Sequence, residues 1–211
     1  MRRKRFDQKS TGTASSRPPQ GGAVMRPSVT AALMQALFQE WAETGYGALS
    51  LENVAKRAGA GKAALYRRWP SKLAMVIDSL GKVGMDVAVP ETPDAGSLEG
   101  DLRAWLAGMR DLLNRRVVRR ILPDLQAEML RSPELAEAIR GPLQNRYASN
   151  ASVILDRAIR RGEISKGVDK DLAMNALMSM LYWRLIIRSE PADNKYIDRL
   201  TRFLAAALRA Q

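Results

Sequence analysis

The chain of 211 residues contains no cysteine and no histidine. Without cysteine, disulfide bonds, thiolate zinc sites and cysteine nucleophiles are excluded, and a reducing compartment is the natural setting. Without histidine, a serine-histidine-acid triad, a histidine-ligated metal and the usual general base near neutral pH are excluded as well. We therefore expect no enzyme activity, no metal site and no cofactor.

Long apolar runs are also missing. The longest weakly charged segment, residues 172–187, is interrupted by Arg184 and is shorter than the roughly 18 residues that a membrane span requires. The basic start, Met1 to Arg5, has no apolar stretch behind it and does not look like a secretory signal. Hydrophobic residues nevertheless make up 46% of the chain, which is enough for a buried core. The sequence predicts a globular, cytoplasmic protein with no membrane contact.

Acidic residues are in the minority, and the imbalance is concentrated at the N-terminal end. Lys and Arg number 34 against 22 Asp and Glu, which gives a net charge of +12. Residues 1–80 contain 13 basic and only 5 acidic side chains. A basic region of this kind attracts polyanions, of which nucleic acid is the commonest in cells. The alternative interpretation is a surface charge that only keeps the protein in solution.

Two segments have the composition of irregular structure. Residues 1–25 are rich in Ser, Thr, Gly, Pro and charge, which predicts a disordered basic arm that lies along DNA phosphates. The alternatives for this segment are an idle tail, or an upstream start-site artefact with Met25 as the true beginning. Residues 90–97 contain a second cluster of breakers and predict an exposed loop or domain boundary. No segment alternates with a period of two, so we expect an all-α fold.

Four helices are predicted after the arm. The first begins at the N-cap residue Ser28 and ends at Gly45, because glycine adopts the left-handed conformation at little cost. The second is short and begins after Ser50, and the third covers residues 62–68. Pro70 ends the third helix because the residue before proline is pushed out of helical geometry. The fourth helix begins after Ser71.

The rest of the chain has the apolar spacing of helices. We predict helices over residues 98–114, 117–130, 133–140, 142–161, 169–188 and 194–209. A kink or break is expected at Pro123, because proline has no N–H to donate within a helix.

The second and third helices are joined by a glycine-containing turn within the basic region, a pattern typical of a helix-turn-helix. The third helix of such a motif enters a DNA major groove about 12 Å wide, so its outer face needs small or polar side chains. Leu65 and Trp69, four residues apart, are predicted to face the core. The predicted DNA contacts are Ser50, Lys62, Ala63, Ala64, Tyr66, Arg67, Arg68 and Lys72.

These residues have different expected roles. Lys62 and Arg67 reach guanine or phosphate, and the hydroxyl of Tyr66 suits a phosphate oxygen. Two alanines, at positions 63 and 64, let the backbone approach the base edges. Lys72 lies in the first turn of the fourth helix, where the positive end of the helix dipole also favours an anion.

Three stretches around this motif resemble the DNA-binding domain of the TetR (tetracycline-repressor-like) regulators. They read ALFQEWAETGY from Ala36, LENVAKRAG from Leu51 and LYRRWPSK from Leu65. The resemblance implies an N-terminal three-helix helix-turn-helix domain, residues 26–72, and a C-terminal helical effector-binding and dimerisation domain, residues 73–211. The chain departs from the family pattern in the turn at Gly61 and at Trp69, where phenylalanine is usual. These departures leave the operator sequence open.

The resemblance also implies a ligand-responsive repressor that binds a palindromic double-stranded DNA operator as a homodimer and is released by a small molecule. In the family, the final two helices of each subunit form a four-helix dimer interface. The apolar residues that suit this role are Leu177, Leu181, Leu185, Ile197, Leu200, Phe203 and Leu204. The alternative for this stripe is a core within one chain.

Apolar and flexible side chains of the middle helices are the candidates for an effector pocket: Trp105, Met109, Leu125, Met129, Tyr147, Met174 and Met178. Methionine adapts to varied shapes, which favours an apolar or aromatic small molecule. The alternative for each of them is an ordinary core position.

Two other functions remain open on the sequence. A helical enzyme would act through carboxylates such as Asp124 and Glu128, which are four residues apart and share a helix face. An architectural protein would bind any DNA in a salt-sensitive manner and would need no effector.

Overall fold

The computed structural model describes residues 27–86 and 94–211, apart from the side chains of residues 27, 83–86 and 142–151. The predicted arm over residues 1–25 lies outside the described residues. The described part of the chain is all-α, as predicted, and contains no strand. Its helices are α1 (Pro27–Ala48), α2 (Leu51–Arg57), α3 (Lys62–Tyr66), α4 (Lys72–Asp86), α5 (Leu98–Asn114), α6 (Arg116–Arg131), α7 (Pro133–Arg160), α8 (Lys170–Tyr182), the π-helical segment η1 (Trp183–Ile187) and α9 (Asn194–Arg209).

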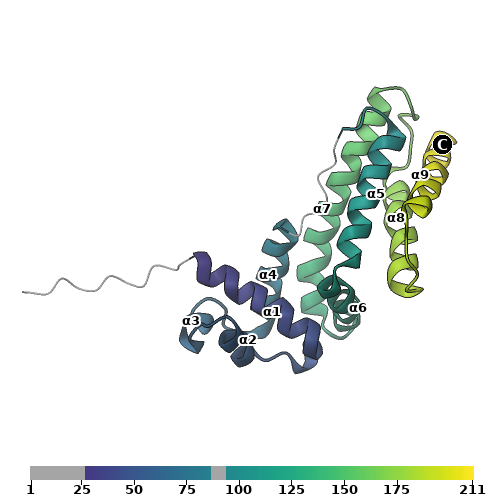
Figure 1. Cartoon of the computed structure of the whole chain (residues 1–211). Helices are drawn as coiled ribbons and strands as arrows, with labels where there is room; N and C mark the ends of the chain where they lie inside the picture. Colours follow the sequence, from purple (N-terminus) through teal and green to yellow (C-terminus); the bar gives the residue numbers. More distant parts are fainter. Residues whose placement is uncertain (1–26, 87–93) are drawn as a thin grey trace, which may run out of the picture.

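The helices form two groups (Figure 1). Helices α1 to α4 gather at one end of the molecule, and α5 and α7 run side by side away from them. Helix α9 packs on α5, and α8 packs on α7, at the opposite side of the molecule from α3. None of the described helices combines the length and apolarity that crossing a membrane would need.

Two clusters of buried hydrophobic side chains match these groups. The larger joins α5, the C-terminal part of α7, α8 and α9. The smaller fills the space between α1 and α4, and it also includes Ile121 and Leu125 of α6 and Leu135 and Ile139 of α7. The N-terminal helices therefore share their core with the helices that follow the predicted boundary at residue 72.

Two predicted helix breaks are wrong. Helix α6 continues through Pro123, and α7 is a single helix of 28 residues where the sequence predicts an interruption near residue 141. Besides removing a hydrogen bond, proline disfavours helical geometry at the preceding residue through a clash with that residue's Cβ and N–H. Gly141 has no Cβ, which reduces that clash.

The predicted helix over residues 169–188 changes type before its end. It begins at the N-cap Asp169, whose side chain accepts the N–H of Leu172 at 3.0 Å, and remains α-helical as far as Tyr182. The π-helical segment η1 follows. A π turn contains more residues than an α turn, so it changes which side chains face the core.

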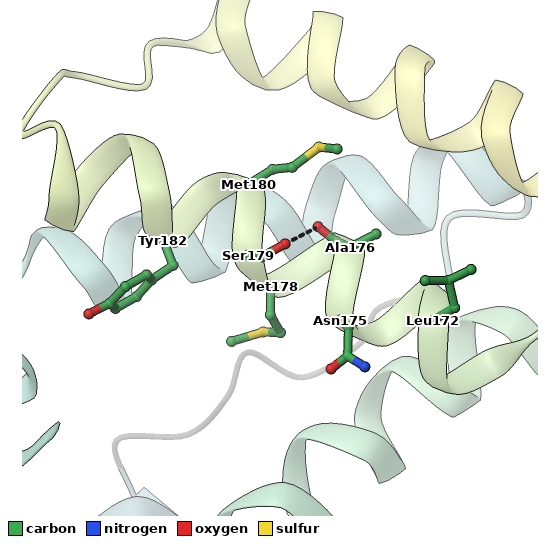
Figure 2. A pocket seen from close by; sticks show the side chains of 7 residues that line it. All are labelled: Leu172, Asn175, Ala176, Met178, Ser179, Met180 and Tyr182. Atoms are coloured by element: carbon green, nitrogen blue, oxygen red, sulfur yellow. Dashed lines mark hydrogen bonds between the residues drawn. The ribbon is translucent and has the colours of Figure 1, made fainter. Parts of the chain in front are cut away.

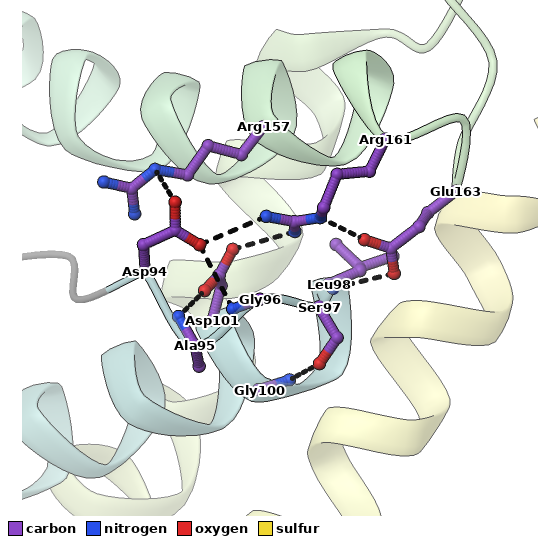
Figure 3. Close-up of polar contacts among 10 residues, drawn as sticks. All are labelled: Asp94, Ala95, Gly96, Ser97, Leu98, Gly100, Asp101, Arg157, Arg161 and Glu163. Atoms are coloured by element: carbon purple, nitrogen blue, oxygen red, sulfur yellow. Dashed lines mark hydrogen bonds and ion pairs between the residues drawn. The ribbon is translucent and has the colours of Figure 1, made fainter.

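A polar network fixes the beginning of α5 against the end of α7 (Figure 3). The carboxylate of Asp101 is fully buried, and it accepts the N–H of Ala95 at 2.6 Å and a guanidinium N–H of Arg161 at 2.9 Å. Arg161 also donates to Glu163, which accepts the N–H of Leu98 at 2.8 Å. Burial alone would raise the pKa of Glu163, but the hydrogen bonds from Leu98 and Arg161 outweigh burial and lower it. Because each buried charge has partners, the network is part of the scaffold.

Helix α6 holds the end of α1 through one carboxylate. Within α1 the backbone leaves helical geometry at Gly45, with φ of 78°, as the sequence predicts. Directly beside this bend, Asp124 accepts the indole N–H of Trp41 at 2.5 Å and the backbone N–H of Tyr46 at 2.7 Å. Asp124 thus bonds to the N-terminal domain, which argues against its use with Glu128 as a catalytic pair.

Replacing Asp124 with alanine should destabilise the protein by about 2–3 kcal/mol. Each buried donor that loses its acceptor costs about 1–3 kcal/mol, and these two donors are only partly buried. The measurement is the free energy of urea unfolding. Glu128→Ala is the matched control, because the ion pair of Glu128 among the described residues is with Arg131 at 3.5 Å, whose side chain is 72% exposed. Equal unfolding free energies for the two variants would contradict this role of Asp124.

Candidate nucleic-acid interface

Helix α2 is attached to α1 by a buried acidic side chain. Glu40 is only 4% exposed, and its carboxylate accepts hydrogen bonds from Asn53 at 2.9 Å and Arg57 at 3.0 Å. Arg57 also donates to Glu43 at 2.6 Å, and this hydrogen bond lowers the pKa of Glu43. Together with the buried Val54, these contacts set the position of α2.

Helix α3 has only five residues, too few for a helix to be stable by itself. Leu65 is fully buried and Trp69 is 4% exposed, and both belong to the smaller core cluster. The indole N–H of Trp69 also donates to Asp78 of α4 at 2.8 Å. Trp69, which stands where the family usually has phenylalanine, therefore anchors α3 to α4.

The opposite face of α3 is exposed. The side chain of Lys62 is 66% exposed and Tyr66 is 44% exposed, while Ala63 and Arg67 are also exposed. Positions 62, 63, 66 and 67 lie on one side of a helix. Ala64 is half-buried at the edge of this face. The structure thus brings four predicted DNA contacts together on a surface with two cations, one aromatic side chain and one methyl group.

The other three predicted contacts have partners within the chain. The Ser50 hydroxyl accepts the N–H of Asn53 at 3.4 Å as the N-cap of α2. Arg68 is half-buried and donates to the Thr30 hydroxyl at 3.1 Å and the carbonyl of residue 64 at 2.6 Å. Lys72 donates to the carbonyl of Tyr46 at 2.7 Å, and its ammonium lies 4.4 Å from the centre of the Tyr46 ring.

One residue that contacts the exposed face of α3 was absent from the sequence predictions. Glu52, the second residue of α2, accepts the Tyr66 hydroxyl at 3.3 Å and lies 3.7 Å from the ammonium of Lys62. Burial raises the pKa of Tyr66, and the charge of Glu52 raises it further. The sequence contains no local signal for this cluster, because Tyr66 follows Glu52 by 14 residues and the two meet only through the turn.

The predicted effector residues do not form one group. Trp105, Met109 and Met174 are buried in the larger cluster, with Met178 partly buried against it. In contrast, Leu125 and Met129 belong to the smaller cluster. The side chain of Tyr147 lies outside the described residues. The indole N–H of Trp105 is buried and has no hydrogen-bond acceptor among the described residues.

An apolar groove of about 500 Å³ runs along α8. Its lining includes Met178, but none of the other predicted effector residues, and every lining side chain comes from α8: Leu172, Asn175, Ala176, Met178, Ser179, Met180 and Tyr182. Figure 2 shows these side chains on different sides of a single helix, with Met178 and Met180 pointing in opposite directions. The groove is therefore open helix surface and does not enclose a ligand.

Most of the predicted dimer interface is buried within the subunit itself. Leu177, Leu181, Leu185, Ile197, Leu200 and Leu204 are at most 6% exposed, so they form the intrachain core and are unavailable to a second chain. Only Phe203, which is 59% exposed, keeps the predicted position at the surface. For these six residues the structure favours the alternative, a core within one chain, because the regular apolar stripe of each helix packs on its own subunit. The large exposed apolar side chains of α8, η1 and α9 are Leu172, Trp183, Ile187 and Phe203.

The comparison with known proteins agrees with this geometry. Residues 33–78 match the family model described as bacterial regulatory proteins, tetR family, and residues 92–204 match the tetracyclin repressor-like C-terminal domain. The chain is 31% identical over 175 residues to the DNA-binding transcriptional repressor TetR of Mycobacteroides abscessus, covering 81% of this chain and 88% of that protein.

Solved structures share the fold. The crystal structure of a TetR family transcription regulator, SCO0332, is 29% identical with a TM-score of 0.65, over 85% of this chain and 97% of that one. The transcriptional regulator FadR of Bacillus subtilis in complex with stearoyl-CoA is 19% identical with a TM-score of 0.64, again over 85% and 97% of the two chains. The family models and the relative of 31% identity cover both groups of helices, and the chain belongs to the TetR family of helix-turn-helix transcriptional regulators.

Proposed function

We propose that this regulator is a homodimeric repressor that binds a palindromic operator and is released by an apolar small molecule. The observation that supports the DNA contact is the exposed face of α3, with Leu65 and Trp69 buried behind it. A side chain arrangement of this kind lets the helix enter a major groove without losing its own core contacts. In a two-fold dimer, two such helices bind half-sites about 34–36 Å apart, so the operator is a palindrome.

The side chains of α3 divide into base and phosphate contacts. Lys62 and Arg67 reach guanine or phosphate, and Tyr66 donates its hydroxyl to a phosphate oxygen. The small side chains at 63 and 64 allow close approach of the backbone. Ser50, Arg68 and Lys72 are proposed as phosphate contacts at the edges. Lys72 retains a third ammonium N–H beside the two carbonyl groups that it contacts.

The second chain covers the exposed apolar face of α8, η1 and α9. Leu172, Trp183, Ile187 and Phe203 are each more than half exposed. Ala206 and Ala207 are exposed on α9 about one turn after Phe203, and the exposed C-cap Ala210 follows. Small side chains permit close packing of helices from two subunits. This face replaces the interface that the sequence predicts.

The effector is proposed to enter the larger core beside Trp105. The buried indole N–H of Trp105 lacks an acceptor, so an apolar molecule that carries one acceptor oxygen would complete its hydrogen bonding. Met109, Met174 and Met178 are adaptable enough to make room for such a molecule. FadR, of the same fold, is described in complex with stearoyl-CoA, which is a precedent for a largely apolar ligand.

Ligand binding would act on DNA affinity through α6. Helix α6 contacts α5 on one side and α1 on the other, and Asp124 joins it to the end of α1. A shift of α6 that favours one orientation of α3 by 1–3 kcal/mol would change operator affinity about 5- to 150-fold. We place this regulation in the cytoplasm, with the DNA, and infer no catalytic role.

Arg67→Ala should weaken binding to an operator selected from random DNA by about 1–3 kcal/mol, because it removes one base or phosphate contact. Fluorescence anisotropy of a labelled duplex measures this loss. Lys195→Ala on α9 removes the same charge from an exposed position outside α3 and serves as the matched control. The proposal fails if both variants bind the operator as tightly as the wild type.

Phe203→Glu should convert the dimer to a monomer, since it places a charge in the middle of the apolar contact. Sedimentation velocity at micromolar concentration measures the change. Leu130 of α6 is 82% exposed and lies outside this face, so Leu130→Glu should remain a dimer. A Phe203→Glu chain that sediments as a dimer would show that the subunits meet elsewhere.

A further inference from the structure

The DNA-facing surface contains a carboxylate among its cations. Glu52 of α2 is 48% exposed in its side chain, and it contacts both Lys62 and Tyr66 of α3. The Ser50 hydroxyl also donates to this carboxylate, at 3.2 Å. The hydrogen bond from its own backbone N–H lowers the pKa of Glu52, and the charge of Lys62 lowers it further. At neutral pH the Glu52 carboxylate is therefore an anion, and it lies beside Lys62 and Tyr66, two of the proposed DNA contacts.

Such an anion opposes DNA binding in a way that does not depend on sequence. Phosphate oxygens and the carboxylate compete for the same donors, the ammonium of Lys62 and the hydroxyl of Tyr66. Each phosphate contact that a protein gains strengthens binding to any DNA, whatever its sequence. A side chain that occupies these donors therefore lowers the affinity for random DNA.

The same carboxylate has a favourable partner only at certain bases. It accepts hydrogen bonds and donates none when ionised. In the major groove the amino groups of cytosine and adenine are the donors, and a carboxylate typically accepts from N4 of cytosine. Its contribution is thus repulsive at phosphates and attractive at one kind of base edge.

From this arrangement we infer that Glu52 is a specificity-determining residue. On random DNA its carboxylate stays bound to Lys62 and Tyr66, which weakens their contacts with phosphate. Where a base presents an amino group, the carboxylate accepts from that group, and Lys62 and Tyr66 become free to bind phosphate. This inference rests on the proposed DNA-binding function of α3. It concerns the ratio of operator affinity to random-DNA affinity, and it assigns a role to a residue of α2 that does not itself belong to the recognition helix.

The test compares wild type, Glu52→Gln and Glu137→Gln as full-length chains. Glu137 is exposed on α7, so its variant carries the same change of net charge away from α3. Anisotropy titrations use a random-sequence duplex and a selected operator at salt concentrations from 50 to 200 mM. Circular dichroism melting confirms that each variant folds.

Glu52→Gln should bind the random duplex about four- to eightfold more tightly at 0.1–0.2 M salt, which is the gain from one additional phosphate contact. The slope of log affinity against log salt should become steeper by about 0.9, and the ratio of operator to random affinity should fall. Adding Lys62→Ala to Glu52→Gln should remove the gain. Glu137→Gln should match the wild type in every titration.

Three results would overturn the inference, and they separate it from the proposed function. If Glu52→Gln binds random DNA with unchanged affinity and salt slope, Glu52 does not restrain Lys62. If both affinities fall together with the melting temperature, Glu52 only stabilises α2. If the wild type prefers no sequence at all, the operator proposal itself is wrong, and the inference falls with it.

Discussion

The burial of Leu65 and Trp69 determines which face of α3 is exposed, and the proposed DNA contact depends on it. A five-residue helix has almost no stability of its own. These two side chains pack into a core formed by α1, α2 and α4, together with α6 and the beginning of α7. Because that core extends beyond the N-terminal helices, the position of α3 is connected physically to helices that also contact the C-terminal core.

Polar contacts connect the end of α1 to both α6 and α4. Asp124 of α6 accepts two donors at the end of α1, and Lys72 of α4 donates to the carbonyl of Tyr46 on the same turn. Trp41 and Tyr46 also meet edge to face, with ring centres 5.5 Å apart. The end of α1 is therefore a meeting point of α4 and α6. In the proposed regulation, a movement of α6 would reach the end of α1 through these hydrogen bonds.

Sequence patterns predicted the parts of this protein that depend on local spacing. The four-residue separation of Leu65 and Trp69, the proline that follows, and the N-cap Ser50 were enough to predict α2 and α3 and the exposed face. Contacts between distant segments had no such signal. Asp124 meets Trp41 across 83 residues, and Glu52 meets Tyr66 across 14. The sequence could not locate the dimer face, because α8 is apolar on nearly every side and its composition does not distinguish the face toward its own core from the face toward a partner.

The absence of cysteine allows a direct measurement of where α3 lies on DNA. Ala63→Cys introduces the only thiol of the chain on the exposed face of α3, and a tethered iron chelate at that thiol cleaves nearby DNA. With the selected operator, the account predicts two cleavage clusters, related by two-fold symmetry and about 10 base pairs or a multiple of that apart. The same reagent at Lys195→Cys on α9 should leave the DNA intact. Diffuse cleavage from residue 63, or equal cleavage from residue 195, would contradict the placement of α3 in the major groove.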